Sequence, residues 1–398
     1  MSGAGTHNVF RFQVPALIVG IIGIVLLAVG GLGGDSGQFY RAWLVGFIFV
    51  AGIPIGSLAL LMLQYLTGGS WGILIRRHLE AAVKTLPLIM LAFIPIVIGL
   101  RHIYPWAVPA WEHDEVLAHK HLWMNPGFFI GRALFFFIAW SLIGYFLTRW
   151  DRRFEETMDP RLGLAQRKMS AVGLLFVALG MTFMAIDWIM SLERAWYSTM
   201  FGISYIVGNA LSALCFCVLM LVALHREEPL ASYARPGIFR DLGNLMLAFT
   251  MLWMYTAFSE FMLIWYANIR EEVPYFLHRM DGGWGYVSVL LLLFHFFLPF
   301  FMLLMRAIKD RPKTLGIVAG LLIIMRVVDY IWVIVPSFHS GLPEPSGFHW
   351  TYLAAVMGLA GLWFFAFLGV LKREPLLPMY EEEVTAALSG EREALSHG

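Results

Sequence analysis

The sequence has few charged residues and almost no cysteine. Asp, Glu, Lys and Arg make up 14 % of the 398 residues, whereas soluble domains carry about 25 %. The formal net charge of +1 says nothing useful about nucleic acid, and no nucleic-acid partner is expected; for so apolar a chain, the split of charge between the two sides of the membrane matters more. Cys215 and Cys217 are two positions apart on one apolar segment and face nearly opposite sides of a helix. They suit neither a mutual disulfide nor a metal pair and are expected to be small core residues.

Several motifs of energy-converting proteins are also missing. There is no CxxCH sequence for covalent haem attachment and no GxxxxGK[ST] loop for ATP. A membrane cytochrome b needs paired histidines as axial ligands, and only His295 lies well inside an apolar segment. We therefore expect no covalently attached or bis-histidine haem and no ATP site in this chain, and we assign no other cofactor to it.

Apolar residues are abundant, at 59 % of the chain with a mean hydropathy of +0.72. A membrane-spanning helix needs about 20 apolar residues. Ten segments meet this requirement and predict an all-α polytopic membrane protein: about 14–34, 42–66, 86–104, 127–149, 169–192, 199–223, 242–268, 284–306, 314–336 and 350–371. The first segment is too long for a signal peptide and is expected to be retained. Residues 1–374 then form the integral membrane domain, and 375–398 a cytoplasmic tail.

The distribution of positive charge predicts the orientation. With ten spans both termini lie on one side, and 20 of the 28 Lys and Arg residues fall on that side. The opposite side has 6, and Arg132 and Arg326 lie within spans. Because cytoplasmic loops carry the excess of Lys and Arg, both termini are expected in the cytoplasm.

A short internal similarity suggests two halves. Residues 186–190, IDWIM, resemble residues 328–332, VDYIW, on segments four apart that point the same way. This favours two four-helix bundles, helices two to five (about 42–192) and six to nine (about 199–336), with helices one and ten flanking them. The glycines and prolines at 52–56 and at Pro95 would also allow the broken helices found in transporters.

Ionisable residues within spans are costly and often functional. They gather in the middle and outer half of the predicted spans, whereas the inner half offers only weaker groups such as Gln64, Ser170 and Asn244. The candidates for a proton path are Asp187, Glu260, Asp329, Arg326, His295, Arg132, Ser191 and Tyr330. Arg326 and Asp329 share a helix face and are expected to form a salt bridge. Asp187, with Ser191 one turn away, and Glu260 have no cation on their own helix, so both are candidates for proton exchange.

A group of histidines on the outer side has two interpretations. It comprises His102, His113, His119 and His121. Zinc accepts such ligands, but the spacing matches no standard site and Lys120 separates two of them. A solvated or partner-contacting loop and a metal site both remain open.

Six stretches together resemble one family. They are residues 68–87, 99–107, 123–140, 185–202, 258–272 and 325–338, which include GGSWGILIRRHLEAAVKTLP, WMNPGFFIGRALFFFIAW and AIDWIMSLERAWYSTMFG. They resemble the F subunit (ActF) of bacterial alternative complex III, a quinol-oxidising respiratory or photosynthetic complex. That family is related to the NrfD-like, polysulfide-reductase-type membrane subunits.

The resemblance implies two four-helix bundles with flanking helices and no redox centre in this chain. Partner subunits would supply the cofactors: an NrfD-like membrane subunit that oxidises menaquinol, an iron–sulfur protein and a multihaem cytochrome c, all among lipids. The F subunit would conduct protons or support assembly. In 258–272 many members are expected to have Gln and Pro where this chain has Glu260 and Arg270, which favours Asp187 as the proton carrier. A secondary ion or solute transporter, or a purely structural subunit of the same complex, are the alternatives.

Overall fold

A computed structural model describes residues 8–33, 36–108, 115–281, 283–339 and 347–378. Within these ranges every regular element is a helix. Ten helices are long and apolar enough to cross a membrane. The predicted all-α, multi-pass membrane fold is therefore confirmed. Most of the tail expected after residue 374, and His113 of the outer histidine group, lie outside the described residues.

The ten spans are built from long helices and a few interrupted ones. They are α1 (Gln13–Leu32), α2 (Ser36–Thr67), α3 (Ser70–Val83) continued by α4 (Leu86–Ala92) and α5 (Ile94–Ile98), α8 (Pro126–Thr157), α9 (Pro160–Trp188), α10 (Thr199–Leu224), α12 (Pro236–Ala267), α14 (Trp284–Leu291) continued by η6 (Leu292–Phe297) and α15 (Leu298–Leu304), α17 (Pro312–Ile334) and α18 (Thr351–Leu371). Shorter elements are η2 (Asn8–Phe12), α6 (Leu100–Ile103), η3 (Pro105–Ala107), α7 (Glu115–Lys120), η5 (Met190–Leu192), α11 (Leu230–Tyr233), α13 (Val273–His278), α16 (Arg306–Lys309) and η7 (Val335–His339).

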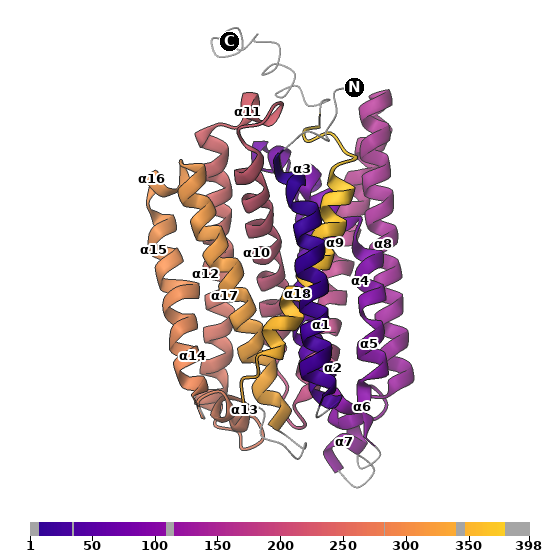
Figure 1. The fold of residues 1–398 in the computed structure, drawn as a ribbon, viewed down its shortest axis with the longest axis vertical. Coiled ribbons are helices and arrows are strands. Elements are labelled where there is room, and N and C mark those ends of the chain that lie inside the picture. The colour runs from indigo at the N-terminus through magenta and orange to yellow at the C-terminus, as the bar shows by residue number, and fades with distance from the viewer. Residues whose placement is uncertain (1–7, 34–35, 109–114, 282, 340–346, 379–398) are drawn as a thin grey trace.

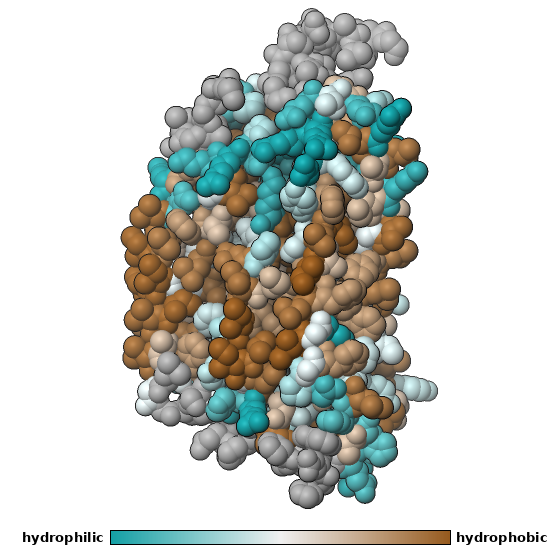
Figure 2. All heavy atoms as spheres, turned by 90° about the vertical axis from the view of Figure 1, so that its right-hand side faces the viewer, coloured by the Kyte–Doolittle hydropathy of each residue, from teal (hydrophilic) through white to brown (hydrophobic). Residues whose placement is uncertain are grey.

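The helices run between two ends of the molecule (Figure 1). At one end, here called the terminal end, α1 begins and α18 finishes, and Gln13 donates a hydrogen bond to the Phe365 carbonyl. The opposite end, with α7 and α13, is called the distal end (Figure 1). Figure 2 shows an apolar band across the middle of one face, with hydrophilic residues gathered toward the ends. This pattern is what a bilayer-spanning protein requires.

Local sequence sets the helix boundaries. Asn125 caps α8, accepting a hydrogen bond from the Phe128 amide at 2.9 Å, and Pro126 occupies the first turn. Asp159 caps α9 in the same way, through the Arg161 amide at 2.9 Å. Both arrangements satisfy amide groups that have no partner within a helix. The chain reverses between α8 and α9 at Met158, whose φ of 52° is left-handed.

Helices α2 and α10 form the centre of the molecule. The most apolar 18-residue stretch of α2 is entirely buried, and α2 contacts α1, α3, α9, α10 and α18. Gly52 and Gly56 of α2 lie directly against Asn209 of α10, where a Cβ atom would collide. Since α2 and α10 come from different predicted bundles and pack together, the two-bundle grouping stays a prediction. The helix continues through Pro54, so the break considered for residues 52–56 is absent.

The third span differs from the prediction. It was expected to start near residue 86, but a helix already begins at Ser70, and Arg76 and Arg77 are buried in it instead of lying in a loop. Proline at an early position of α4 and of α5 interrupts the span, because proline lacks an amide proton and disrupts a helix interior. Lys84 and Thr85 lie at the break between α3 and α4.

Helices α1 and α18 pack closely through glycine. A Cβ atom on Gly358 of α18 would lie 2.8 Å from the Ile24 amide nitrogen of α1, and Gly23 faces Gly358 across the contact. Small residues let helix backbones approach in this way within membranes. The pair flanks α2 and so encloses one side of the core.

Candidate functional site

Asp187 forms a two-pronged ion pair with an arginine of the neighbouring helix. Arg132 Nε lies 2.7 Å from Asp187 Oδ2, and Arg132 Nη2 lies 2.8 Å from Oδ1. Asp187 is fully buried near the end of α9, and Arg132 is 8 % exposed near the start of α8. Helix α9 itself carries Arg161, Arg167 and Lys168 in its first turns, so the expectation that the helix of Asp187 has no cation is wrong; the partner of Asp187 nevertheless comes from α8. Such bidentate pairs are the strongest type of charged hydrogen bond.

Aromatic groups enclose this pair. The Trp123 indole donates to Asp187 Oδ1 at 3.0 Å, and the Arg132 guanidinium lies 4.0 Å from the centre of a Trp123 ring. Ser191 donates a hydrogen bond to the backbone carbonyl of Asp187, one turn away as predicted. The bond does not involve the Asp187 carboxylate. Tyr104 donates to the Trp188 carbonyl at 3.1 Å, and burial, with a smaller effect of Asp187, raises the pKa of its phenol. These contacts hold Asp187 in one position and shield it from water.

The second group of predicted residues lies on α17 and its neighbours. Arg326 and Asp329 form the predicted salt bridge. Tyr330 donates a hydrogen bond to the Asn209 side chain of α10. Gly208, on α10, lies against the Arg326 guanidinium with no room for a Cβ atom. The cation is therefore 2 % exposed and lies directly on the α10 backbone.

Glu260 contributes to a cavity of about 510 Å³ beside this pair. Arg326, Asp329 and Tyr330 also line the cavity, and half of its remaining lining residues are aromatic. Phe258, 51 % exposed, lies at its edge, so the cavity reaches the molecular surface. Glu260 itself is 7 % exposed, and among the described residues its Oε1 atom has no hydrogen-bond partner. An acidic oxygen is thus left available to a ligand, water or proton.

His295 lies behind this cavity because of a local change of helix type. The segment η6 is a π-helix, and such segments often occur at functional sites. His295 is fully buried with its ring 3.9 Å from a Trp253 ring centre. Neither ring nitrogen has a hydrogen-bond partner among the described residues. Trp253 lines the cavity, so the histidine is one side chain away from it.

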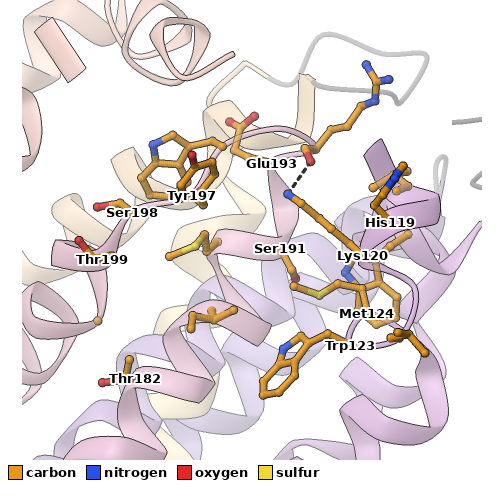
Figure 3. Close-up of a pocket in the computed structure, with 18 residues that line it drawn as sticks. His119, Lys120, Trp123, Met124, Thr182, Ser191, Glu193, Tyr197, Ser198 and Thr199 are labelled. Atoms are coloured by element: carbon orange, nitrogen blue, oxygen red, sulfur yellow. Dashed lines mark hydrogen bonds between the residues drawn. The ribbon is translucent and has the colours of Figure 1, made fainter. Parts of the chain in front are cut away.

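A second cavity of about 540 Å³ lies beside the Arg132–Asp187 pair. Figure 3 shows His119, Lys120, Trp123 and Met124 on one side of it, facing Tyr197, Ser198 and Thr199. Lys120 Nζ closes part of it by donating to the Arg194 carbonyl at 3.0 Å (Figure 3).

The two cavities share a wall. Ile189 lines the cavity near Glu260, while Met190 and Ser191 line the one near Asp187. Residues 189–198, here called the partition, connect α9 to α10. The predicted site residues therefore form two groups: Arg132 and Asp187 with Ser191 of the partition, and Glu260, Arg326, Asp329 and Tyr330 around the other cavity with His295 behind it.

Arg279, which sequence reasoning assigned to the outer loops, holds the partition in place. It is fully buried, pairs with Glu193 at 3.5 Å and donates to Ser337 Oγ at 2.7 Å. Its guanidinium lies 3.5 Å from the ring centre of Tyr275, and burial raises the pKa of that phenol. Tyr275 in turn stacks on Trp196 of the partition with ring centres 3.7 Å apart.

A buried charged network at the terminal end was also missed. Arg77 Nη1 contacts Glu80 Oε2 at 2.8 Å and Asp151 Oδ2 at 2.9 Å, and Arg77 Nη2 contacts Glu155 Oε2 at 2.7 Å. Tyr65 donates to Glu80 and Asp151 at 3.2 and 3.1 Å. The expectation that this half holds only weak polar groups is therefore wrong. Three carboxylates around one guanidinium form an arrangement able to retain a proton.

The outer histidines do not form a metal site in the described part of the chain. No three His, Cys, Asp or Glu side chains cluster there in a way that could hold an ion. His102 stacks on Tyr40 with ring centres 5.3 Å apart, and His119 Nδ1 lies 2.7 Å from the Glu115 carbonyl oxygen.

Comparison with known proteins gives no family for this chain. No protein-family model matches the sequence, and no curated protein matches it.

Proposed function

We propose that this chain is a cofactor-free integral membrane subunit of a quinol-oxidising electron-transfer complex of the alternative complex III type. In this proposal it supplies a polar path for protons and assembly contacts. Its partners are an NrfD-like subunit that oxidises menaquinol, an iron–sulfur protein and a multihaem cytochrome c. It lies in the bacterial inner membrane with both termini in the cytoplasm.

One observation carries the proton role: Glu260 and Asp329 line a cavity that reaches the surface from within a membrane span. Intramembrane carboxylates that face a cavity are typical of proton and ion routes. The free Oε1 atom of Glu260 can accept a proton or a water molecule. In this proposal Glu260 exchanges protons with the distal side, and the Arg326–Asp329 pair keeps the cavity wall charged and hydrated.

The terminal-end network supports a path that continues into the other half. Glu80 and Asp151 are buried around Arg77, so carboxylates are present near both ends of the spans. Helix α8 carries both Asp151 of this network and Arg132 of the distal pair. Proton transfer across the protein requires at least one group that can carry a proton in each half of the membrane-spanning region.

The purely structural alternative is favoured by a different observation. Asp187 has its oxygens occupied by Arg132 and Trp123, which is the arrangement of a packing salt bridge. For the transporter alternative, one of the two helix breaks considered is present, next to Pro95 between α4 and α5, whereas α2 continues through Pro54.

Purification of the tagged chain from its native membrane in mild detergent tests the assignment to a complex. Haem absorbance and an iron–sulfur signal that co-elute with the chain in constant proportion are expected. A chain that elutes alone, or with copies of itself only, contradicts the proposal and favours transport. Glu260→Gln in the intact complex, reconstituted in vesicles, then tests the proton role: quinol oxidation with normal proton release would leave only the structural role.

A further inference from the structure

A groove crosses the membrane-facing surface near the terminal end. It has a volume of about 390 Å³ and lies between α8 and the break that separates α3 from α4. Its lining residues are Val83, Lys84, Pro87, Ser141, Tyr145, Thr148, Arg149 and Arg152. On this side of the molecule, hydrophilic side chains extend from the terminal end into the apolar band (Figure 2).

The upper part of the groove is positively charged. Lys84, Arg149 and Arg152 supply three cations, and one carboxylate, Glu374, bonds two of them. Lys84 Nζ lies 2.7 Å from Glu374 Oε1, and Arg152 Nη2 lies 3.1 Å from Oε2. Arg149 stays on the α8 face with its guanidinium 5.6 Å from the Tyr145 ring centre. The groove therefore has a net positive charge to which an anion can bind.

The lower part of the groove suits a neutral, elongated group. Ser141, Tyr145, Thr148 and Arg152 recur every three or four residues and so follow one face of α8. From Arg149 down to Ser141 this face descends about 12 Å, at about 1.5 Å per residue. Ser141 Oγ is buried there and has no hydrogen-bond partner among the described residues. An ester or hydroxyl group at that depth would satisfy it.

We propose that this groove binds one anionic glycerophospholipid. The phosphate lies among Lys84, Arg149 and Arg152, the glycerol region reaches Ser141, and the acyl chains continue over the apolar surface. Basic pockets between membrane helices bind anionic head groups in this way, and guanidinium groups match the geometry of a phosphate. This site is separate from the distal cavities, so it does not depend on the proposed function.

Native mass spectrometry of the full chain, with phosphatidylglycerol or phosphatidylcholine added, tests this proposal. We expect the unmodified protein to retain phosphatidylglycerol preferentially. Each cation near a membrane surface contributes about fivefold, so Arg149→Gln with Arg152→Gln is expected to reduce the preference on the order of 25-fold. The matched control is Arg153→Gln with Arg161→Gln, two exposed arginines outside the groove, and it is expected to keep the preference.

A second variant keeps the test decisive if the arginine variant folds poorly. Ser141→Phe fills the lower groove and leaves every cation in place, so it is expected to reduce retention of phosphatidylglycerol. Equal loss in the Arg153→Gln and Arg161→Gln control would show that general surface charge attracts the lipid and would overturn the proposal. Competition by inorganic phosphate at millimolar concentration would do the same, because the site would then bind a free anion. An unmodified protein without preference for phosphatidylglycerol also contradicts it.

Discussion

The Arg132–Asp187 pair allows stability and function to be separated in one experiment. Asp187→Leu removes a carboxylate that accepts three hydrogen bonds and leaves the Arg132 guanidinium buried without its counter-charge. Breaking a buried ion pair from one side costs about 3–5 kcal/mol. We therefore expect Asp187→Leu to lower the free energy of unfolding by an amount in that range.

The double variant Arg132→Met with Asp187→Leu shows how much of this loss of stability comes from the unpaired arginine charge. It removes both charges and replaces them with apolar side chains, and such replacements of buried pairs are often neutral. We expect its stability to lie within about 1 kcal/mol of the unmodified protein, so the two single losses should be strongly non-additive. Unfolding in mixed detergent micelles, followed by tryptophan fluorescence, measures the four members of the cycle.

Turnover of the assembled complex then assigns the role of the pair. If Asp187 only holds α8 against α9, the double variant regains quinol oxidation and proton release together with stability. If Asp187 carries protons, both activities stay low although stability returns. A loss below about 1 kcal/mol for Asp187→Leu alone would refute the reasoning, since a buried unpaired arginine cannot be that inexpensive.

Three further changes test other parts of the structure. Arg77→Gln strands its buried carboxylate partners and is expected to cost about 3–5 kcal/mol in the same unfolding assay. Gly358→Leu should separate α1 from α18 and lower the melting temperature, whereas Gly131→Leu, where a Cβ atom has no neighbour within 4 Å, should not. The ion pair with Arg240 lowers the pKa of Asp310, so its stabilisation is complete above the unfolded value and lost as the pH falls through the folded one. Asp310→Asn should therefore lower the melting temperature at about pH 6 and have a progressively smaller effect as the pH falls below about 4.

The sequence predicted the spans because long apolar segments leave few alternatives in a bilayer. It also predicted the Arg326–Asp329 pair, since three positions on a helix place two side chains together. The partner of Asp187 was not predictable in the same way. Arg132 was a candidate, but its pairing depends on how α8 and α9 face each other, and no spacing along the chain encodes that.

Two buried arginines were missed for a common reason. Arg77 and Arg279 lie in weakly apolar stretches, which in a sequence resemble solvated loops. Carboxylates distant along the chain, such as Asp151 and Glu193, compensate their charges, and only the folded packing brings these partners together. The polar residues at 76–80 were a usable signal, because an arginine and a glutamate three positions later lie on one face of a helix and can pair there.

The partition gives the two distal cavities a common mechanical element. It consists of ten residues, 189–198, of which Ile189 lines the cavity near Glu260 and seven others line the cavity near Asp187. Displacing the backbone at residues 189–191 toward one cavity would enlarge the other, so a ligand that caused such a displacement would change the space on both sides. By thermodynamic linkage this influence is reciprocal, and each compartment would report the filling of its neighbour.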